Sequence, residues 1–203
     1  MRIASLFLLS LLAMLQGCVS APELKTAPSA ATQLLYQQHL QNIALIEQFS
    51  LHARIGVQTE GKGFSGSLMW QHDTANDAIT LYSPLGNQVA SIKKTSNKVT
   101  LEEANGKSTS ASDTEALTQT VLGWRLPLAG LADWSLGRPT NNDIQDITLD
   151  NQGLVNTLKQ DGWDIQYLKY AESNGQLLPS KILLKSDKVN LKLLVENWEI
   201  TAK

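Results

Sequence analysis

The amino-acid sequence predicts a mainly β domain: an antiparallel meander of ten or eleven short strands that forms a curved sheet, with helices at its start and in its middle. Apolar and polar residues alternate over most of the chain after residue 50, which is the period of a half-buried strand. Tight-turn dipeptides such as Asp161-Gly162 and Asn174-Gly175 separate the short apolar runs. We therefore expect a curved meander wrapped around a few helical elements.

Apolar residues at steps of three and four predict a first helix, which begins near Thr32 and reaches about residue 49. Its apolar face comprises Tyr36, Leu40, Ile43, Ile46 and Phe49. A single apolar face indicates that one side of this helix packs against the sheet.

Short strands follow in two groups. The first group is predicted at residues 51–57, 64–71, 78–82, 88–93 and 98–102. The second group is predicted at residues 144–149, 154–160, 163–170, 181–186 and 189–200. The short turns within each group indicate antiparallel neighbours.

A helical stretch separates the two groups of strands. Ser112 or Asp113 can cap a helix that runs to Leu122. A second short helix is predicted at residues 128–136, where Gly137 ends it. These helices are short enough to lie across one face of the sheet.

The N-terminus has the features of a secretory signal. Arg2 precedes an apolar stretch, residues 3–15, that is shorter than the roughly 20 residues a membrane-spanning helix needs. Leu15-Gln16-Gly17-Cys18 resembles the lipobox that bacterial lipoprotein signal peptidase reads, although Gln16 is larger than the usual residue there. An ordinary secretory signal followed by a chance cysteine is the alternative.

Cysteine usage favours a lipid anchor. Cys18 is the one cysteine of the chain, so no internal disulfide can form, and acylation explains its position best. Val19 stands where an Asp would resemble an inner-membrane retention signal, so we expect anchoring in the periplasm-facing leaflet of the outer membrane. The predicted organisation is a signal peptide at residues 1–17, a lipidated flexible tether at residues 18–31 and one folded domain at residues 32–203.

The charge balance is mild, with a net charge of −2 over 203 residues. This balance is poor for binding nucleic acid, which needs a basic face. It also gives no polybasic attraction to anionic lipid. We therefore expect the lipid anchor, not charge, to hold the protein at its membrane.

Catalytic motifs are largely absent from the sequence. His39, His52 and His72 lack the spacing of metal ligands and are expected on the solvated surface. Ser91 and Lys94 match a Ser-x-x-Lys pattern, but that motif needs a helix, and this segment has the period of a strand. We expect no catalytic residues, no metal and no cofactor.

Features suited to binding are more numerous. The chain has five tryptophans. They can fill a core or line an acyl-chain cavity, and periodicity does not separate the two. In the Ser83-Pro84-Leu85-Gly86 loop, Pro84 and Gly86 set the turn, which places Leu85 at its tip. A lone exposed leucine is common and usually has no function, but on a protein tethered to a bilayer this one can act as a shallow membrane probe.

Several of these motifs, in this order, resemble the LolB family. They are the lipobox, the Ser83-Pro84-Leu85-Gly86 loop, Leu126-Pro127-Leu128, Trp134-x-Leu136-Gly137-x-Pro139 and Asn197-Trp198. Trp124 departs from the pattern, where a smaller apolar residue is expected. The resemblance implies an unclosed barrel with a helical lid over an apolar cavity. It also implies that acylated lipoproteins arrive from the periplasmic carrier LolA and are inserted, without nucleotide, into outer-membrane phospholipid by a monomeric receptor.

The resemblance also suggests roles for particular residues. Cys18 is the lipidation site, and Leu85, with Pro84 and Gly86, forms the membrane-insertion loop. The expected cavity residues are Trp70, Leu81, Leu126, Trp134, Leu136, Trp163 and Trp198.

Three alternatives remain open from the sequence. The first is a tethered lipoprotein of the same shape that stores or carries free lipid. The second is a scaffold of an envelope-assembly machine with a filled core. The third is an envelope hydrolase that uses Ser91.

Overall fold

The computed structural model describes residues 27–201 and builds them into one sheet and three helices. The first six strands are β1 (Gln48–Thr59), β2 (Lys62–His72), β3 (Asp77–Tyr82), β4 (Gln88–Thr95), β5 (Lys98–Glu103) and β6 (Ser108–Ala111). The other five are β7 (Ile144–Leu149), β8 (Val155–Gln160), β9 (Trp163–Ser173), β10 (Gln176–Lys185) and β11 (Val189–Thr201). The helices are α2 (Ala30–Ala44), α3 (Thr114–Leu122) and α4 (Leu128–Ser135).

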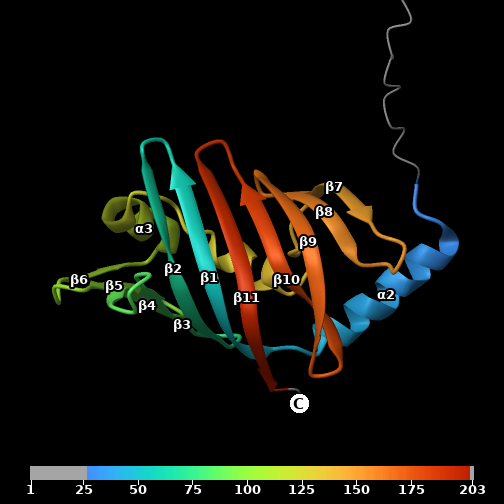
Figure 1. Ribbon diagram of the computed structural model, residues 1–203, viewed down its shortest axis with the longest axis horizontal. Helices are drawn as coiled ribbons and strands as arrows, with labels where there is room; N and C mark the ends of the chain where they lie inside the picture. The colour runs from blue at the N-terminus through green and yellow to red at the C-terminus, as the bar shows by residue number, and fades with distance from the viewer. Residues whose placement is uncertain (1–26, 202–203) are drawn as a thin grey trace, which may run out of the picture.

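All eleven strands of this sheet are antiparallel to their neighbours. The strand order is β6-β5-β4-β3-β2-β1-β11-β10-β9-β8-β7, so the first and last strands meet at the centre and β6 and β7 are free edges. The strands at the β4–β6 end run nearly across the direction of β1 and β11, which shows how strongly the sheet coils (Figure 1). The predicted fold class, an unclosed antiparallel barrel, is confirmed.

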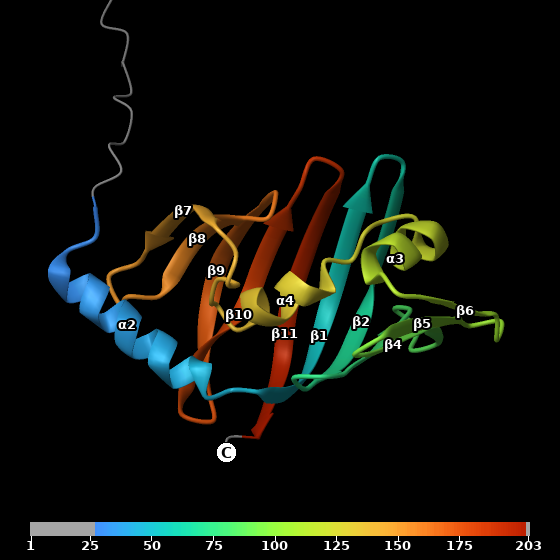
Figure 2. The ribbon, with the colours of Figure 1, turned by 180° about the vertical axis from the view of Figure 1, so that it is seen from behind.

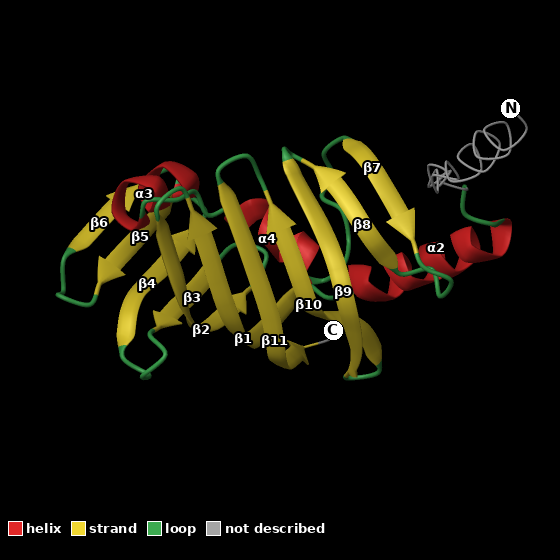
Figure 3. Ribbon diagram, turned by 45° about the horizontal axis from the view of Figure 1, so that its top comes forward, coloured by secondary structure: helices red, strands yellow, loops and turns green. Residues whose placement is uncertain are grey.

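The helices cover one face and one end of the sheet. α3 and α4 lie on the same face, in front of the strands when the molecule is seen from behind (Figure 2). α2 lies at the β7–β9 end, far from β4–β6 (Figure 3). Along β1, buried and exposed side chains alternate, and the buried ones belong to the continuous apolar core on the covered face. The apolar side chains of the alternating pattern therefore point toward the helices, as the sequence indicates.

The first helix differs from its prediction at both ends. α2 begins at Ala30, where the Ser29 hydroxyl accepts a hydrogen bond from the Thr32 amide, so it includes two residues assigned to the tether. It ends at Ala44, and Phe49 instead lies on β1. There the Phe49 ring packs edge-on against two tryptophans of the sheet, which outweighs its helical spacing.

Two strand predictions were incomplete. β6 was missed because its four residues, Ser108–Ala111, show no apolar alternation. β10 begins five residues before its predicted start. The prediction began too late because Pro179 lies within the strand, and proline normally indicates a strand end. The pairing of β10 with β9 shifts register next to Pro179, which is how the strand accommodates it.

The two middle helices were predicted well. Asp113 caps α3 by accepting a hydrogen bond from the Ala116 amide at 2.6 Å. Gly123 closes α3 with a φ of +84°, a left-handed conformation that glycine adopts readily. α4 starts directly after Pro127, whose fixed φ suits a helix beginning.

Candidate functional site

The side chains expected to line an acyl-chain cavity lie together in the apolar core. All seven are buried: Trp70, Leu81, Leu126, Trp134, Leu136, Trp163 and Trp198. The four tryptophans among them lie in two aromatic groups. Trp70 and Trp198 flank Phe49, with ring centroids 5.2 and 5.3 Å from it. The rings of Trp134, on α4, and Trp163, on β9, have centroids 6.3 Å apart.

Three of these four indoles donate a hydrogen bond to a defined partner. Trp70 donates to Asp77 at 2.9 Å, and Trp134 donates to Gln160 at 3.0 Å. Trp198 donates to the carbonyl of Pro179 at 3.3 Å. These hydrogen bonds hold the three rings in position, and the low exposure of all seven side chains, at most 9%, shows that they pack closely against their neighbours in this conformation.

Gln160 fixes the end of α4 to the sheet. Its side chain is fully buried, and its amide oxygen accepts from Trp134 Nε1 and from the Thr140 amide at 2.9 Å. Its amide nitrogen donates to the carbonyls of Thr140 and Asn142. One glutamine thus satisfies four polar groups around the segment that follows α4.

Two further side chains hold α4. The Tyr167 hydroxyl donates to the carbonyl of Trp134 at 2.9 Å, and complete burial raises the pKa of Tyr167. Arg138 pairs with Asp133 at 2.7 Å and donates to the carbonyl of Ile43 at 2.7 Å. These contacts connect α4 to β9 and to α2.

α3 is held differently. Its hydrogen bonds and ion pairs in residues 27–201 go to itself and to the linker that follows it. The Thr118 hydroxyl accepts from the Leu126 amide at 2.9 Å, and Glu115 forms an exposed ion pair with Arg125. Apolar packing, through side chains such as Leu117, keeps α3 on β5 and β6. Because β6 is a free edge, α3 covers the least supported part of the sheet.

The Leu85 loop is a compact turn between β3 and β4. The Gly86 amide donates to the Ser83 carbonyl at 2.9 Å, and the Ser83 amide donates to the Asn87 carbonyl at 2.8 Å. Gly86 has a φ of +84°, which explains why glycine stands there. Leu85 is 88% exposed, more than any other large apolar side chain of the described residues. The structure therefore places Leu85 at the tip of a hydrogen-bonded turn, with Pro84 exposed beside it.

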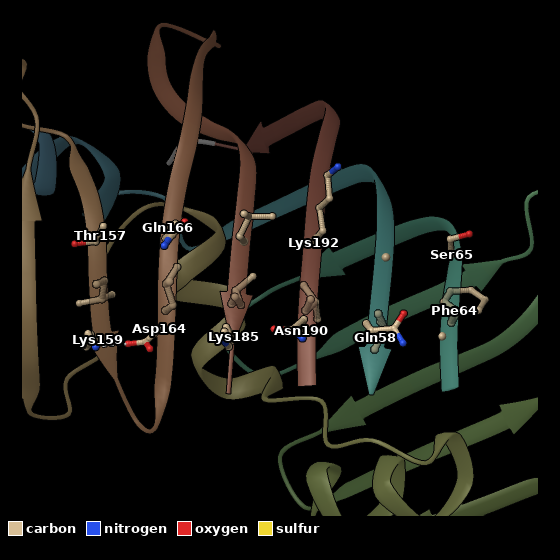
Figure 4. A pocket seen from close by; sticks show the side chains of 18 of the residues that line it. Gln58, Phe64, Ser65, Thr157, Lys159, Asp164, Gln166, Lys185, Asn190 and Lys192 are labelled. Atoms are coloured by element: carbon tan, nitrogen blue, oxygen red, sulfur yellow. Dashed lines mark ion pairs between the residues drawn. The ribbon is translucent and has the colours of Figure 1, made fainter. Parts of the chain in front are cut away.

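A hollow of about 920 Å³ lies on the exposed face of the sheet (Figure 4). Two cross-strand rows line it: Gly63, Gln58, Asn190, Lys185, Asp164 and Lys159, then Ser65, Gly56, Lys192, Leu183, Gln166 and Thr157. Lys159 and Asp164 pair at 2.9 Å. Six apolar residues also line the hollow, namely Val57, Phe64, Leu158, Ile165, Leu184 and Leu191, so its character is mixed. None of the seven predicted cavity residues lines it.

Sequence reasoning missed a buried carboxylate. Asp77 accepts from Trp70 and, at 2.7 Å, shares a hydrogen bond with His72, while Lys94 approaches its other oxygen at 3.2 Å. Burial alone would raise the pKa of Asp77, but hydrogen bonds from His72, Trp70 and Lys94 outweigh burial and hold that pKa below its ordinary value. His72, Asp77 and Lys94 border a smaller hollow of about 470 Å³. The acid, imidazole and amine were separately visible in the sequence, but their pairing depends on strand register.

The histidine predictions were partly wrong. His52 is half-exposed, as expected, and lies 3.8 Å from Glu196. His72 is largely buried against Asp77. The Nε2 atom of His39 is buried without a hydrogen-bond partner, and burial lowers the pKa of this histidine more than nearby Asp150 raises it. In residues 27–201, no group of three or more potential ligand side chains could hold a metal ion.

The Ser-x-x-Lys motif of Ser91 and Lys94 lies on a strand, as predicted. Ser91 and Lys94 lie on β4, and Lys94 is committed to Asp77. Adjacent positions on a strand alternate faces, so residues three apart point away from each other. The Ser-x-x-Lys arrangement of a hydrolase is not formed.

Comparison with known families decides the classification. A family model described as "Outer membrane lipoprotein LolB" matches residues 47–198. The chain belongs to the LolB family. LolB-family relatives include the outer-membrane lipoprotein LolB of Pseudomonas syringae, 30% identical over 94% of this chain and 93% of its own length. The LolB of Pseudomonas aeruginosa is 30% identical over 98% of this chain and 97% of its length.

Solved structures agree with the LolB fold. A LolA superfamily protein from Nitrosomonas europaea aligns with a TM-score of 0.53 and 8% identity, covering 82% of this chain and 93% of that chain. At this identity the match concerns the fold alone. Together, the family and its relatives identify the chain as an outer-membrane lipoprotein.

Other sequence predictions concern residues outside the described range. The signal peptide, Cys18 and most of the tether precede residue 27. Among residues 27–201, no helix has the length and apolar character needed to cross a membrane.

Proposed function

We propose that this LolB-family protein accepts acylated lipoproteins from the periplasmic carrier LolA and releases their acyl chains into outer-membrane phospholipid. The observation that carries this proposal is a continuous apolar core roofed by a helix, α3, whose polar contacts bypass the sheet. Such a roof can be displaced without breaking hydrogen bonds to the strands below it. Cys18 supplies the anchor, and the protein works as a monomer without catalysis.

The cargo's chemistry requires a sheltered route. Three acyl chains carry about 40 methylenes, and at roughly 0.8 kcal/mol each their exposure to water costs up to about 30 kcal/mol. An apolar interior without directed polar anchors can accept such chains and still release them. Transfer then follows relative affinities, with no need for nucleotide.

Acyl chains need space that the packed interior does not offer in this conformation. The seven predicted cavity residues remain the proposed lining. None of them lies on β5 or β6, so displacement of α3 opens an entrance at that end of the core and does not by itself expose the residues beside α4. Gly123, at the end of α3, is the natural pivot, because its left-handed backbone conformation ends the helix. α4 stays in place because Gln160, Tyr167 and Arg138 hold it.

Leu85 performs the release step. An apolar side chain at the tip of a rigid turn can enter the interface between headgroups and acyl chains at little cost. Pro84 and Gly86 keep the turn in shape. This loop thereby brings the protein and its cargo against the bilayer.

A reconstituted transfer assay tests the proposal. The assay follows a labelled lipoprotein from purified LolA to this protein and then into vesicles. Leu85→Glu should leave the first transfer intact and abolish insertion, because a charge at the loop tip opposes entry into lipid. Leu168→Glu, at an exposed leucine of β9, is the matched control and should leave both steps unchanged. Normal insertion by Leu85→Glu would refute the role of the loop.

A scaffold role is the second candidate, and the packed interior favours it. A scaffold accepts no acyl chain, so the fluorescence of its buried tryptophans would not respond to an acylated lipoprotein. A tethered lipid-storage protein would respond to free lipid but would not take cargo from LolA. The first transfer step therefore separates the proposed function from the other two, and the response of tryptophan fluorescence to free lipid separates a storage protein from a scaffold.

A further inference from the structure

The helix next to the predicted tether has an unusual surface. From Ala27 to Ile46 the chain contains no Asp, Glu, Lys or Arg, although 18% of the whole chain is charged. α2 lies within this segment and exposes much of its surface. Surface helices normally carry charges on the solvent side, so a neutral outer face indicates a less polar neighbour than water.

The outward face of α2 begins and ends with leucine. Leu34 is 60% exposed, and Leu45, which caps the helix, is 68% exposed. Gln38 and Gln41 lie between them at steps of four and three, so all four residues follow one stripe. We call Leu34, Gln38, Gln41 and Leu45 the outer stripe.

The opposite face of α2 is fully engaged. Tyr36 and Ile43 are buried in the core. The turn after β7 packs so closely on the helix that a Cβ on Gly153 would lie 2.6 Å from that of Leu35. The carbonyl of Ile43 also accepts a hydrogen bond from Arg138. The helix is thus fixed to the domain, and the outer stripe is available to a partner.

The position of the predicted anchor identifies that partner. Cys18 lies eleven residues before Ser29, the cap of α2, so a fully extended chain places the start of the helix within on the order of 40 Å of the bilayer. We propose that the outer stripe of α2 lies on the phospholipid surface as a second membrane contact, beside the Leu85 loop. This inference rests on the proposed lipid anchor, but not on the transfer of cargo.

Two contacts would set the orientation of the molecule. α2 lies at one end of the long axis, and β3 and β4 lie in the opposite half of the molecule (Figure 1). With both on the bilayer, the sheet lies lengthwise along the membrane. Because the outer stripe is neutral, the contact depends neither on anionic lipid nor on salt, unlike one made by lysines.

Site-specific fluorescence quenching tests this contact. The full lipidated protein is placed in phosphatidylcholine vesicles that carry a nitroxide near the headgroup end of the acyl chain. Acylation consumes the thiol of Cys18, so Gln38→Cys provides one labelling site on the outer stripe. Leu85→Cys reports on the loop, and Leu168→Cys, on the exposed face of β9, is the control.

We expect the label at Gln38 to lose more than about half of its fluorescence, since interfacial helices reach the depth of such a quencher. The label at Leu168 should stay bright. Adding the changes Leu34→Glu and Leu45→Glu to Gln38→Cys should abolish the quenching. Both leucines are exposed, so these changes leave the fold intact. Anionic lipid or added salt should change none of these results.

Each outcome is decisive. Quenching at Leu85 without quenching at Gln38 overturns the second contact and leaves the proposed function standing. Quenching at neither position overturns both membrane contacts. Equal quenching at Leu168 overturns the assignment to α2, and so does quenching at Gln38 that disappears in salt.

Discussion

Two helices of similar length cover the same face of the sheet, but they are held in different ways. α4 is tied to β8, β9 and α2 through Gln160, Tyr167 and Arg138. α3 packs on the edge of the sheet, and its polar contacts end in its own linker. The comparison shows that hydrogen bonds to the sheet can fix one covering helix, α4, while a helix held only by apolar packing, α3, can be displaced.

The largest expected effect comes from removing the attachment of α4. Gln160→Leu leaves the buried Trp134 indole without its partner, and also the part-buried Thr140 amide and two part-buried carbonyls; it should lower the free energy of unfolding by on the order of 3 kcal/mol. Urea denaturation measures the loss. Gln166→Leu, at an exposed position on β9, is the control and should change stability by less than about 0.5 kcal/mol. A small loss for Gln160→Leu would remove the contrast between the helices.

A second test asks whether the strands at the α3 end of the sheet are themselves of low stability. Asp77→Asn removes the charge that joins β2, β3 and β4, and should cost about 2 kcal/mol near neutral pH. The folded-state pKa of Asp77 is depressed, so its contribution is complete above the ordinary value of 3.8 and is lost as pH falls through the folded pKa.

The stabilities of the wild type and Asp77→Asn should therefore converge in acid below pH 3.8, as denaturation at several pH values can show. Asp187→Asn, in an exposed turn, serves as the comparison and should give parallel curves. If Asp77→Asn costs nothing at neutral pH, the carboxylate does not stabilise β2, β3 and β4. Strands β2–β6 would then be mobile together with α3.

The smallest expected effect concerns α3 itself. Thr118→Val keeps the side-chain shape but leaves the Leu126 amide without its acceptor, at a cost of about 1 kcal/mol. Hydrogen exchange should accelerate over residues 114–126 and stay unchanged in α4. Thr120→Val, on the exposed side of the same helix, should leave exchange nearly as it is. Faster exchange in both helices would mean that they open as one unit.

The sequence predicted the fold through local periodicity. Alternating residues along β1 and the turn at Gly162 depend on neighbours in the chain, so they are readable without the structure. The end of α2 was placed too late because Phe49 fits the helical spacing and its true partners, Trp70 and Trp198, are distant in the chain. β6 gave no signal, because its pairing with β5 and not its side chains makes it a strand.

The candidate site was predictable where a short segment defines it. Leu85 stands at the tip of its turn because Pro84 and Gly86 lie beside it, and both are visible in the sequence. Burial of the predicted cavity residues also followed from their apolar character. The support of α4 was not predictable, since Gln160 resembles any polar strand residue until the register brings Trp134 to it.

The open barrel leaves two edge strands, β6 and β7, without a partner on one side. The character of these edges affects whether copies of the protein aggregate on a crowded membrane. Lipid-anchored copies meet often because they diffuse in two dimensions, and a long regular edge would template fibril growth. β6 offers four small residues, and the β7–β8 ladder is interrupted by two register shifts. Neither edge is a good template, so neighbouring copies can collide and separate again without aggregating.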